Sequence, residues 1–146
     1  MLATSNNPTN GTPAVGNERL MQQVTNWVLV PVSPAAAYLL NDLPSWWMFA
    51  LLGGILGVMG ALSGSFSRTM HDYVLTFCFV GQCILFTSAL AGHAWQIDSH
   101  MMFFAALAII STLNNPGALI FGTVLVAGHH LSLSIFLPAL VYPSAS

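Results

Sequence analysis

SWWMFALLGGILGVMGALS, residues 45–63, is the stretch that decides the fold of this chain. It holds no charged residue and approaches the ~20 apolar residues that a helix needs to cross the hydrocarbon core of a bilayer. Trp46 and Trp47 open the stretch as an aromatic pair, which suits the boundary between membrane and water. Residues 45–63 therefore predict a transmembrane helix.

The composition of the whole chain agrees with this prediction. Hydrophobic residues make up 55% of the 146 residues, charged residues only 4%, and lysine is missing altogether. A soluble domain carries about 25% charged residues, so a surface this poor in charge would aggregate in water. The sequence therefore predicts an integral membrane protein, with the lipid bilayer as a partner. The net charge of −2 forms no basic patch, which argues against a nucleic-acid partner.

Four other apolar segments accompany the first, and together they predict an all-α integral membrane protein, a bundle of about five transmembrane helices. The expected spans cover residues 24–40, 45–63, 72–91, 99–113 and 117–137. Pro31 and Pro34 should kink the first span, because proline lacks an N–H and clashes with the preceding turn. Residues 1–22 are expected to form a flexible polar tail, and residues 23–146 a transmembrane helical domain.

Two arginines give an orientation. Arg19 precedes the first span and Arg68 lies between the second and third, so five crossings would place both on one side. The positive-inside tendency assigns that side to the cytoplasm. Asp42 and Asp98 then fall on the opposite side. The chain is expected to be a multi-pass protein with a cytoplasmic N-terminus.

A stripe of small residues runs along the span at residues 45–63: Gly53, Gly57, Gly60 and Gly64. Such a stripe lets another backbone approach closely. The plainer interpretation is packing against a neighbouring span of the same bundle, and the sharper one is the face of a homodimer. Cys78 and Cys83 are too badly placed on one helix to bridge, and we expect them to act as small packing residues.

Residues 92–108, GHAWQIDSHMMFFAALA, concentrate polar side chains between two apolar runs. A turn at residues 94–98 would let His93 and His100 face each other from adjacent antiparallel helices, and it would leave Asp98 at a wet edge, where a charge costs little. His129 and His130 fall in the same outer half of the bundle. Adjacent residues of a helix point about 100° apart, so only one of that pair should face a shared centre. His71, at the inner end of the third span, is expected to be a separate interface residue.

Four histidines at one level favour a bound metal or haem, because neutral imidazole is the commonest metal ligand. Soft thioethers beside imidazole favour copper, and two histidines from different helices can hold a haem iron. The candidate ligands are His93, His100, His129 and His130, with Trp95, Gln96, Asp98 and Met101 around them. A proton- or quinone-responsive polar cluster, or purely structural hydrogen bonding, are the alternatives. No nucleophile and base are brought together by spacing, so we do not predict an enzyme.

Residues 92–108, followed by GHHLSLSIFLPALVYP at 128–143, resemble the multi-span membrane input region of bacterial methyl-accepting chemotaxis receptors and related signalling proteins. The resemblance covers about residues 92–143. The positions that fit its pattern are His93, Trp95, Gln96, Asp98, His100, Met101, Phe103, Phe104, Ala105, His129, His130, Leu131, Pro138, Val141, Tyr142 and Pro143.

The chain also departs from that pattern. Relatives often carry a histidine where Leu29 stands and commonly have asparagine in place of Ser134. They continue through another span into a cytoplasmic signalling domain, whereas this chain ends at Ser146. Any site that needs the position of Leu29 or the further helix is therefore affected.

The resemblance implies a sensory input module for signal transduction in the bacterial inner (cell) membrane. Its signalling output domain would be missing from this chain or supplied by a partner. A cytochrome-b-like, haem-binding electron-transfer or anchor subunit is the alternative, and a Soret band would distinguish it from a copper sensor. A pore is less favoured, because the inner halves of the third and fifth spans show little polarity besides Thr76, Gln82 and Thr123.

Overall fold

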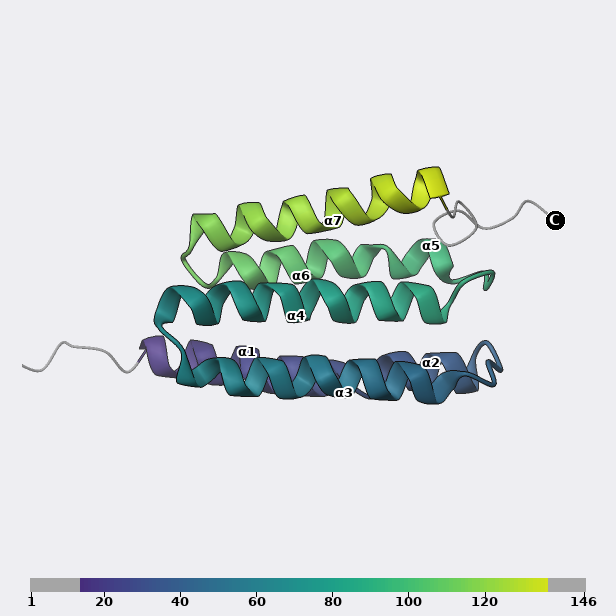
Figure 1. The fold of residues 1–146 in the computed structure, drawn as a ribbon, viewed down its shortest axis with the longest axis horizontal. Coiled ribbons are helices and arrows are strands. Elements are labelled where there is room, and N and C mark those ends of the chain that lie inside the picture. Colours follow the sequence, from purple (N-terminus) through teal and green to yellow (C-terminus); the bar gives the residue numbers. More distant parts are fainter. Residues whose placement is uncertain (1–13, 137–146) are drawn as a thin grey trace, which may run out of the picture.

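The computed structural model describes residues 14–136, with their side chains from residue 20 onward, and within this part every regular element is a helix. The elements are α1 (Ala14–Leu29), α2 (Val32–Leu39), α3 (Trp46–Leu62), the short 3-10 turn η1 (Ser63–Ser65), α4 (Arg68–Ala89), α5 (Gln96–Ser99), α6 (Met101–Ser111) and α7 (Pro116–Phe136). Figure 1 shows them as a bundle of roughly parallel rods, in which α1 with α2 and α5 with α6 each form one broken rod.

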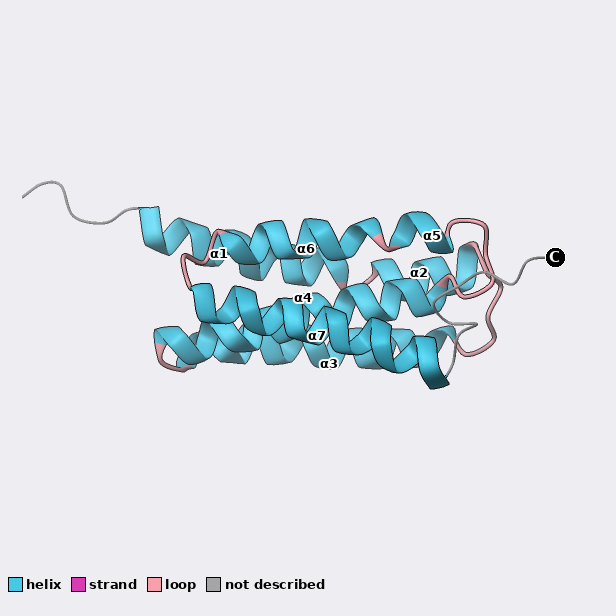
Figure 2. Cartoon of the chain, turned by 90° about the horizontal axis from the view of Figure 1, so that it is seen from above, coloured by secondary structure: helices cyan, strands magenta, loops and turns pink. Residues whose placement is uncertain are grey.

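Helix α4 is the centre of the bundle. It contacts each of the other α-helices, and Figure 2 shows the rods side by side along their length. Within its apolar stretch 56% of the residues are buried, against 22% for α3 and 6% for α7. Helix α7 packs only on α4 and α6 among the larger contacts, so it lies at the periphery of the bundle.

Three helices are long and apolar enough to cross a membrane: α3 with η1 (Trp46–Ser65), α4, and α7. The helical rod Gln96–Ser111 is apolar but shorter. The all-helical prediction is thus confirmed for the described residues, and the five predicted spans coincide with α1–α2, α3, α4, α5–α6 and α7. Passage of all five through a bilayer stays a prediction.

The described exposed charges differ in sign between the two ends of the bundle, and the orientation of the chain in a membrane stays a prediction. Arg68 begins α4 at the end of the bundle where α1 also begins, whereas Asp42 and Asp98 lie at the opposite end, next to the α2–α3 and α4–α5 connections (Figure 1). All three of these side chains are exposed. The side chain of Arg19 lies outside the described part.

The N-terminal boundary needs a correction. Residues 1–13 lie outside the described part, but α1 begins at Ala14, so residues 14–22 are helical rather than part of a flexible tail. The reason is visible at Gln22, which is 1% exposed and donates from Nε2 to Oγ1 of Thr112 at 3.0 Å. The polar residues at this end of α1 therefore include one that is paired inside the bundle, which polarity read along the chain does not reveal.

The predicted kink in the first span is present. Helix α1 ends at Leu29 and α2 begins at Val32, with a turn over Val30 and Pro31 between them. Pro31 and Pro34 lack N–H groups, so neither can donate to the carbonyl one turn before it. The break lies against α3 and α4 in the middle of the bundle.

The core lies between α4, α6 and α7. Its buried residues are Leu75, Phe79, Val80, Cys83, Phe103, Ala106, Ile110 and Leu113. Cys78 and Cys83 are both buried and not bridged, and Cys83 belongs to this cluster, as expected for small packing residues. Large apolar side chains such as Ile55, Ile120 and Leu131 are instead more than half exposed on the outside.

Polar side chains collect inside the bundle. The buried ones are Gln22, Asn26, Ser33, Ser63, His71, Asp72, Thr76, Gln82, Thr87, Gln96 and Ser99. An apolar outside with hydrogen-bonding groups between the helices is typical of a bundle that is surrounded by lipid, where such groups join helices. The sequence argument against a pore considered only the third and fifth spans. In the structure α1 and α2 supply three of the buried polar residues, whereas Thr123, which that argument counted, is exposed.

The glycine stripe packs against the α1–α2 rod of the same chain. A Cβ on Gly53 would lie 3.2 Å from the carbonyl oxygen of Val30, and one on Gly57 would lie 2.7 Å from Cγ2 of the same residue. A Cβ on Gly60 would collide with Nδ2 of Asn26, and one on Gly64 would approach Gln23 at 3.2 Å. The plainer interpretation of the stripe therefore holds, and this face is not open to a second copy of the chain.

Gly60→Ala is expected to destabilise the protein by about 1–3 kcal/mol, because the new methyl group enters space that the side chain of Asn26 fills. Asn26 is fully buried and donates to the carbonyl of Leu56 at 3.4 Å, so it has little freedom to move. Gly54→Ala is the matched control, since nothing lies within 4 Å of its new Cβ. Thermal unfolding in detergent compares the two, and equal midpoints would contradict the packing described.

Candidate functional site

The site begins with the turn that joins α4 to α5. Gly92 has a φ of +79°, a conformation that glycine adopts without strain. Its N–H donates to Oε1 of Gln96 at 2.9 Å, and Gln96 then starts α5 as a fully buried residue. The turn thus lies over residues 90–95, earlier than the expected 94–98, and Asp98 is already helical.

His100 and His130 face each other across the contact between the α5–α6 rod and α7. His100 stands at the joint of α5 and α6, His130 lies on α7, and both are half-buried. Their ring centroids are 5.4 Å apart with planes inclined at 58°. The expected pair was His93 with His100, and the structure pairs His100 with His130 instead.

The hydrogen bonds of the two rings define their tautomers. Nδ1 of His100 lies 2.8 Å from the carbonyl oxygen of Gln96, and Nδ1 of His130 lies 2.8 Å from that of Val126. A carbonyl oxygen only accepts, so Nδ1 of each ring is the donor in these contacts. When such a ring is neutral, Nε2 keeps its lone pair. This is the state in which imidazole binds a metal, with Nδ1–H held by a carbonyl.

Two further rings complete the group, which we call the histidine cluster: His100, His129, His130 and Phe103. The centroid of His129 lies 5.5 Å from that of His130 and 5.7 Å from that of Phe103. Phe103, which is 3% exposed, lies 5.2 Å from His130 and 6.1 Å from His100. Phe103 therefore packs against all three imidazoles of the cluster.

His93 does not join the histidine cluster through any described ring contact. It precedes α5 in the turn, where its ring lies 5.8 Å from that of Trp95 and its Nδ1 accepts from the Trp95 N–H at 3.1 Å. The structure thus brings together three of the four predicted ligands and places the fourth in a local pair. Nδ1 of His93 accepts from the backbone N–H of Trp95, two residues later in the chain. The spacing of the histidines does not predict this contact.

The residues predicted around the ligands are mostly directed elsewhere. Met101 is 64% exposed and Trp95 56% exposed. Asp98 is exposed too, and it lines a shallow pocket with Ser99 and Met102 rather than contacting the imidazoles. Gln96 alone contacts the cluster, and it does so through its backbone carbonyl.

Sequence reasoning missed Val126, and it named Phe103 only as a position of the family pattern. Val126 is an ordinary apolar residue, but it lies one helical turn before His130, and that spacing is what allows a histidine to donate to the carbonyl four residues back. Phe103 contacts the cluster through ring packing alone, without a hydrogen bond. Its burial beside an exposed Phe104 is set by which face of α6 meets α4 and α7.

No group of three or more histidine, cysteine, aspartate or glutamate side chains is arranged to hold a metal ion within the described residues. The arrangement on offer for an ion is the pair of His100 and His130. Its ring separation agrees with such a role, because two imidazoles bound to one ion at metal–nitrogen distances of about 2 Å have centroids roughly 5–6 Å apart.

His71 lies apart from the histidine cluster, in the first turns of α4. It is buried rather than placed at an interface with water, and its Nδ1 lies 2.7 Å from Oγ of Ser63. The next residue, Asp72, is also buried and accepts from Nδ2 of Asn115 at 3.0 Å. These contacts tie the start of α4 to η1 and to the start of α7.

Comparison of the chain with protein-family models, with curated proteins and with solved structures finds no match. The resemblance to chemotaxis input regions therefore rests on the residues quoted for it. Three of its histidines, His100, His129 and His130, are those that the fold groups together. Pro138, Val141, Tyr142 and Pro143, which end the pattern, lie outside the described residues.

Proposed function

We propose that the chain is a membrane-embedded sensory input module for signal transduction, and that its histidine cluster binds a copper ion. It acts in a bacterial inner membrane with its N-terminus in the cytoplasm. The observation that carries the proposal is the pair of His100 and His130, whose Nδ1–H groups are held by backbone carbonyls so that both Nε2 lone pairs remain for a ligand.

A bare ion suits the pair better than a haem. Ligation of haem iron from opposite faces requires a flat porphyrin between the two imidazoles, with their centroids roughly 6 Å or more apart. The rings of His100 and His130 are closer than this, at 5.4 Å, and are inclined to one another. Among divalent first-row metals, copper binds a given nitrogen site most tightly, although Met101 is too exposed to add a thioether.

The position of α7 supplies a means of signalling. Only 6% of its apolar stretch is buried, so most of the surface of this helix faces away from α4 and α6, the two helices that it packs against. An ion bound by His100 and His130 would link the α5–α6 rod to α7. A ligand shifts an equilibrium only when it binds one packing better than another, and the bound state requires the two rings to stay together. A signalling output domain would read this shift.

The test is an absorption spectrum and elemental analysis of the full chain purified in detergent, after loading with Cu(I) and, separately, with haem. We expect about one copper per chain, no Soret band, and loss of the copper in the double variant His100→Ala/His130→Ala. Zinc loading in parallel shows how selective the pair is.

The matched control is His93→Ala, which removes a neighbouring imidazole that is paired with Trp95. It should keep its copper. Copper lost from His93→Ala but kept by the double variant would place the site elsewhere and overturn the assignment. A Soret band lost in the double variant would instead establish the cytochrome-b-like alternative, and absence of both ligands would reduce the cluster to structural or proton-responsive bonding.

A further inference from the structure

A small pocket lies at the end of the bundle where α4 connects to α5 (Figure 1). It encloses about 240 Å³. Phe86 and Leu90, one helical turn apart, form its wall on the α4 side, and the rest of its lining comes from the α5–α6 rod and the residue before it. Those lining residues are Trp95, Asp98, Ser99 and Met102. We call this hollow the Asp98 pocket.

Trp95 and Asp98 lie on the same face of one helical turn. The N–H of Ser99 donates to the carbonyl of Trp95 at 2.9 Å, which closes that turn, and residues three apart on a helix are neighbours. The indole of Trp95 is 56% exposed, and the ring of His93 packs edge-on against it at 5.8 Å between centroids. The pocket therefore combines a carboxylate and an indole on one side with the phenyl ring of Phe86 on the other.

The carboxylate of Asp98 has no described lysine or arginine to balance it. The chain contains no lysine. Arg68 begins α4, and the 22 residues of that helix separate it from this end of the bundle by ~33 Å. The charge at the pocket is therefore available to a cationic ligand.

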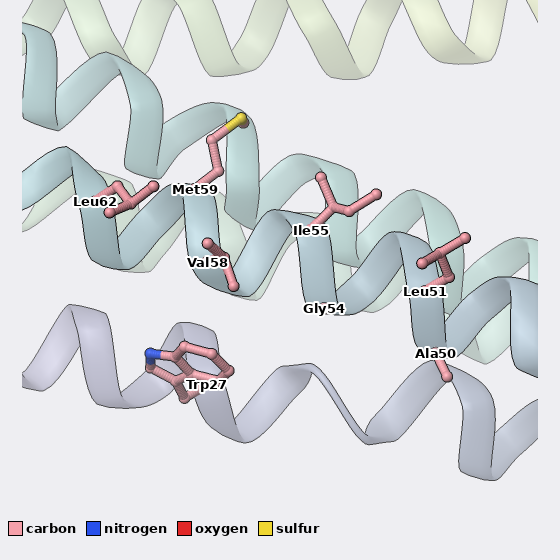
Figure 3. Close-up of a pocket in the computed structure, with 8 residues that line it drawn as sticks. All are labelled: Trp27, Ala50, Leu51, Gly54, Ile55, Val58, Met59 and Leu62. Carbon is pink, nitrogen blue, oxygen red and sulfur yellow. The ribbon is translucent and has the colours of Figure 1, made fainter.

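A larger pocket on the bundle has a different chemistry. It lies between α1 and α3, beside Trp27 and Gly54, and none of its lining residues is charged (Figure 3). Such a surface suits the acyl chains of surrounding lipid, which are as apolar as leucine. A lining carboxylate thus distinguishes the Asp98 pocket from a hollow that merely faces lipid.

We propose that the Asp98 pocket binds a quaternary ammonium group. A cation placed over the face of tryptophan or phenylalanine is attracted by the ring, and choline-type ligands are recognised in this way. The carboxylate of Asp98 adds opposite charge. The volume lies below the ~300 Å³ at which pockets for drug-sized ligands begin, which suits a single headgroup or a small free ligand. The pocket is separate from the histidine cluster and does not rest on the function proposed for it.

The lining favours a quaternary over a primary ammonium. A primary ammonium presents three N–H donors that require acceptors. Only Asp98 and Ser99 bring side-chain oxygens to the pocket, and the buried hydroxyl of Ser99 already donates to the carbonyl of Gln96 at 2.6 Å. A quaternary ammonium has no N–H group, so it leaves no donor unpaired.

The test follows the N-methyl protons of tetramethylammonium by saturation-transfer NMR, with the full chain in maltoside micelles at constant ionic strength. We expect saturable binding in the roughly millimolar range, which corresponds to a weak site open to solvent. Methylammonium should compete several-fold more weakly. Absence of saturable binding, or equal competition by methylammonium, would overturn the proposal.

Asp98→Asn keeps the size of the side chain and removes its charge. We expect the half-saturating concentration to rise by about 3-fold, within the range for loss of an exposed ion pair. Asp42→Asn is the matched control, because Asp42 is also exposed, lies in the α2–α3 connection at the same end of the bundle, and does not line this pocket. Equal effects of the two changes would indicate general attraction by negative charge and would overturn the location.

Trp95→Leu removes the indole and keeps an apolar side chain. The half-saturating concentration should rise by about 2- to 5-fold, the range for an exposed cation–π contact, and Trp95→Phe should restore part of the loss. Trp47→Leu is the matched control, since Trp47 is equally exposed at 56% but lies on α3, outside the pocket. An unchanged affinity in Trp95→Leu would overturn the assignment.

The same measurement distinguishes a lipid headgroup from a free ligand as the source of the quaternary ammonium. Phosphatidylcholine or phosphatidylethanolamine with identical acyl chains is added to the micelles. Displacement of tetramethylammonium by phosphatidylcholine alone identifies a headgroup, and retention in the presence of both lipids identifies a free ligand, so both results support the proposal. Equal displacement by phosphatidylethanolamine, which carries a primary ammonium, would overturn it.

Discussion

His130→Ala is expected to weaken copper binding by at least about 100-fold, the upper range seen when even a residue that supports a ligand is removed. Its Nδ1 is held by the carbonyl of Val126, so its ring is fixed beside that of His100 before an ion binds. Removing this ring leaves His100 with no partner on α7 that is held in the same way. Competition with a Cu(I) chelator of known affinity measures the change in detergent.

His129→Ala is the matched control on the adjacent residue. The ring of His129 lies against Phe103 and His130, and it has no described contact with His100. Its loss should therefore reduce the affinity by less than about 10-fold. If His129→Ala proves the more damaging of the two changes, the ion is bound through His129 rather than His130 and the assigned pair is incorrect.

Phe103→Ala is expected to cost about 3 kcal/mol of stability, the low end for deletion of a buried phenylalanine side chain. The low end applies because burial among helices in lipid or detergent gains packing rather than escape from water. Phe103 is 3% exposed and touches three imidazoles, so its loss should also loosen the histidine cluster.

Phe104→Ala, at the next position, removes the same side chain from a place that is 69% exposed. A change of less than about 0.5 kcal/mol is expected there, as for other surface substitutions. Unfolding in mixed detergent micelles, followed by tryptophan fluorescence, compares the two variants. Equal losses would show that α6 presents a different face to the core than the one described.

Much of the architecture could be predicted from residues taken in order. Long apolar runs without charge require helices in lipid, because every backbone group must be paired within its own segment. Pro31 and Pro34 likewise required a break, and it is found at Val30–Pro31. The start of α1 could not be predicted in this way, since Gln22 is held inside by Thr112, which lies 90 positions further along the chain.

The histidine site was predictable only in part. Spacing placed His100 and His130 at one level of the bundle, but it also placed His93 there. Which ring faces which depends on how the α5–α6 rod turns toward α7, and that is set by the packing of Phe103 and its neighbours. Spacing likewise placed Met101 around the ligands, although the same rotation of α6 leaves it exposed.

By itself, the sequence determined that this protein is a bundle of apolar helices with a break at two prolines and histidines gathered toward one end. These follow from local rules of backbone pairing and hydropathy. Only the tertiary structure decided that Gly53 packs against the break between α1 and α2, and that Oε1 of Gln82 lies near Gly53 without a hydrogen-bond partner. It also decided that His93 pairs with Trp95 and not with the histidine cluster. The physical reason is that each of these depends on how helices rotate about their axes to fill space, and that rotation is a property of the packed bundle as a whole.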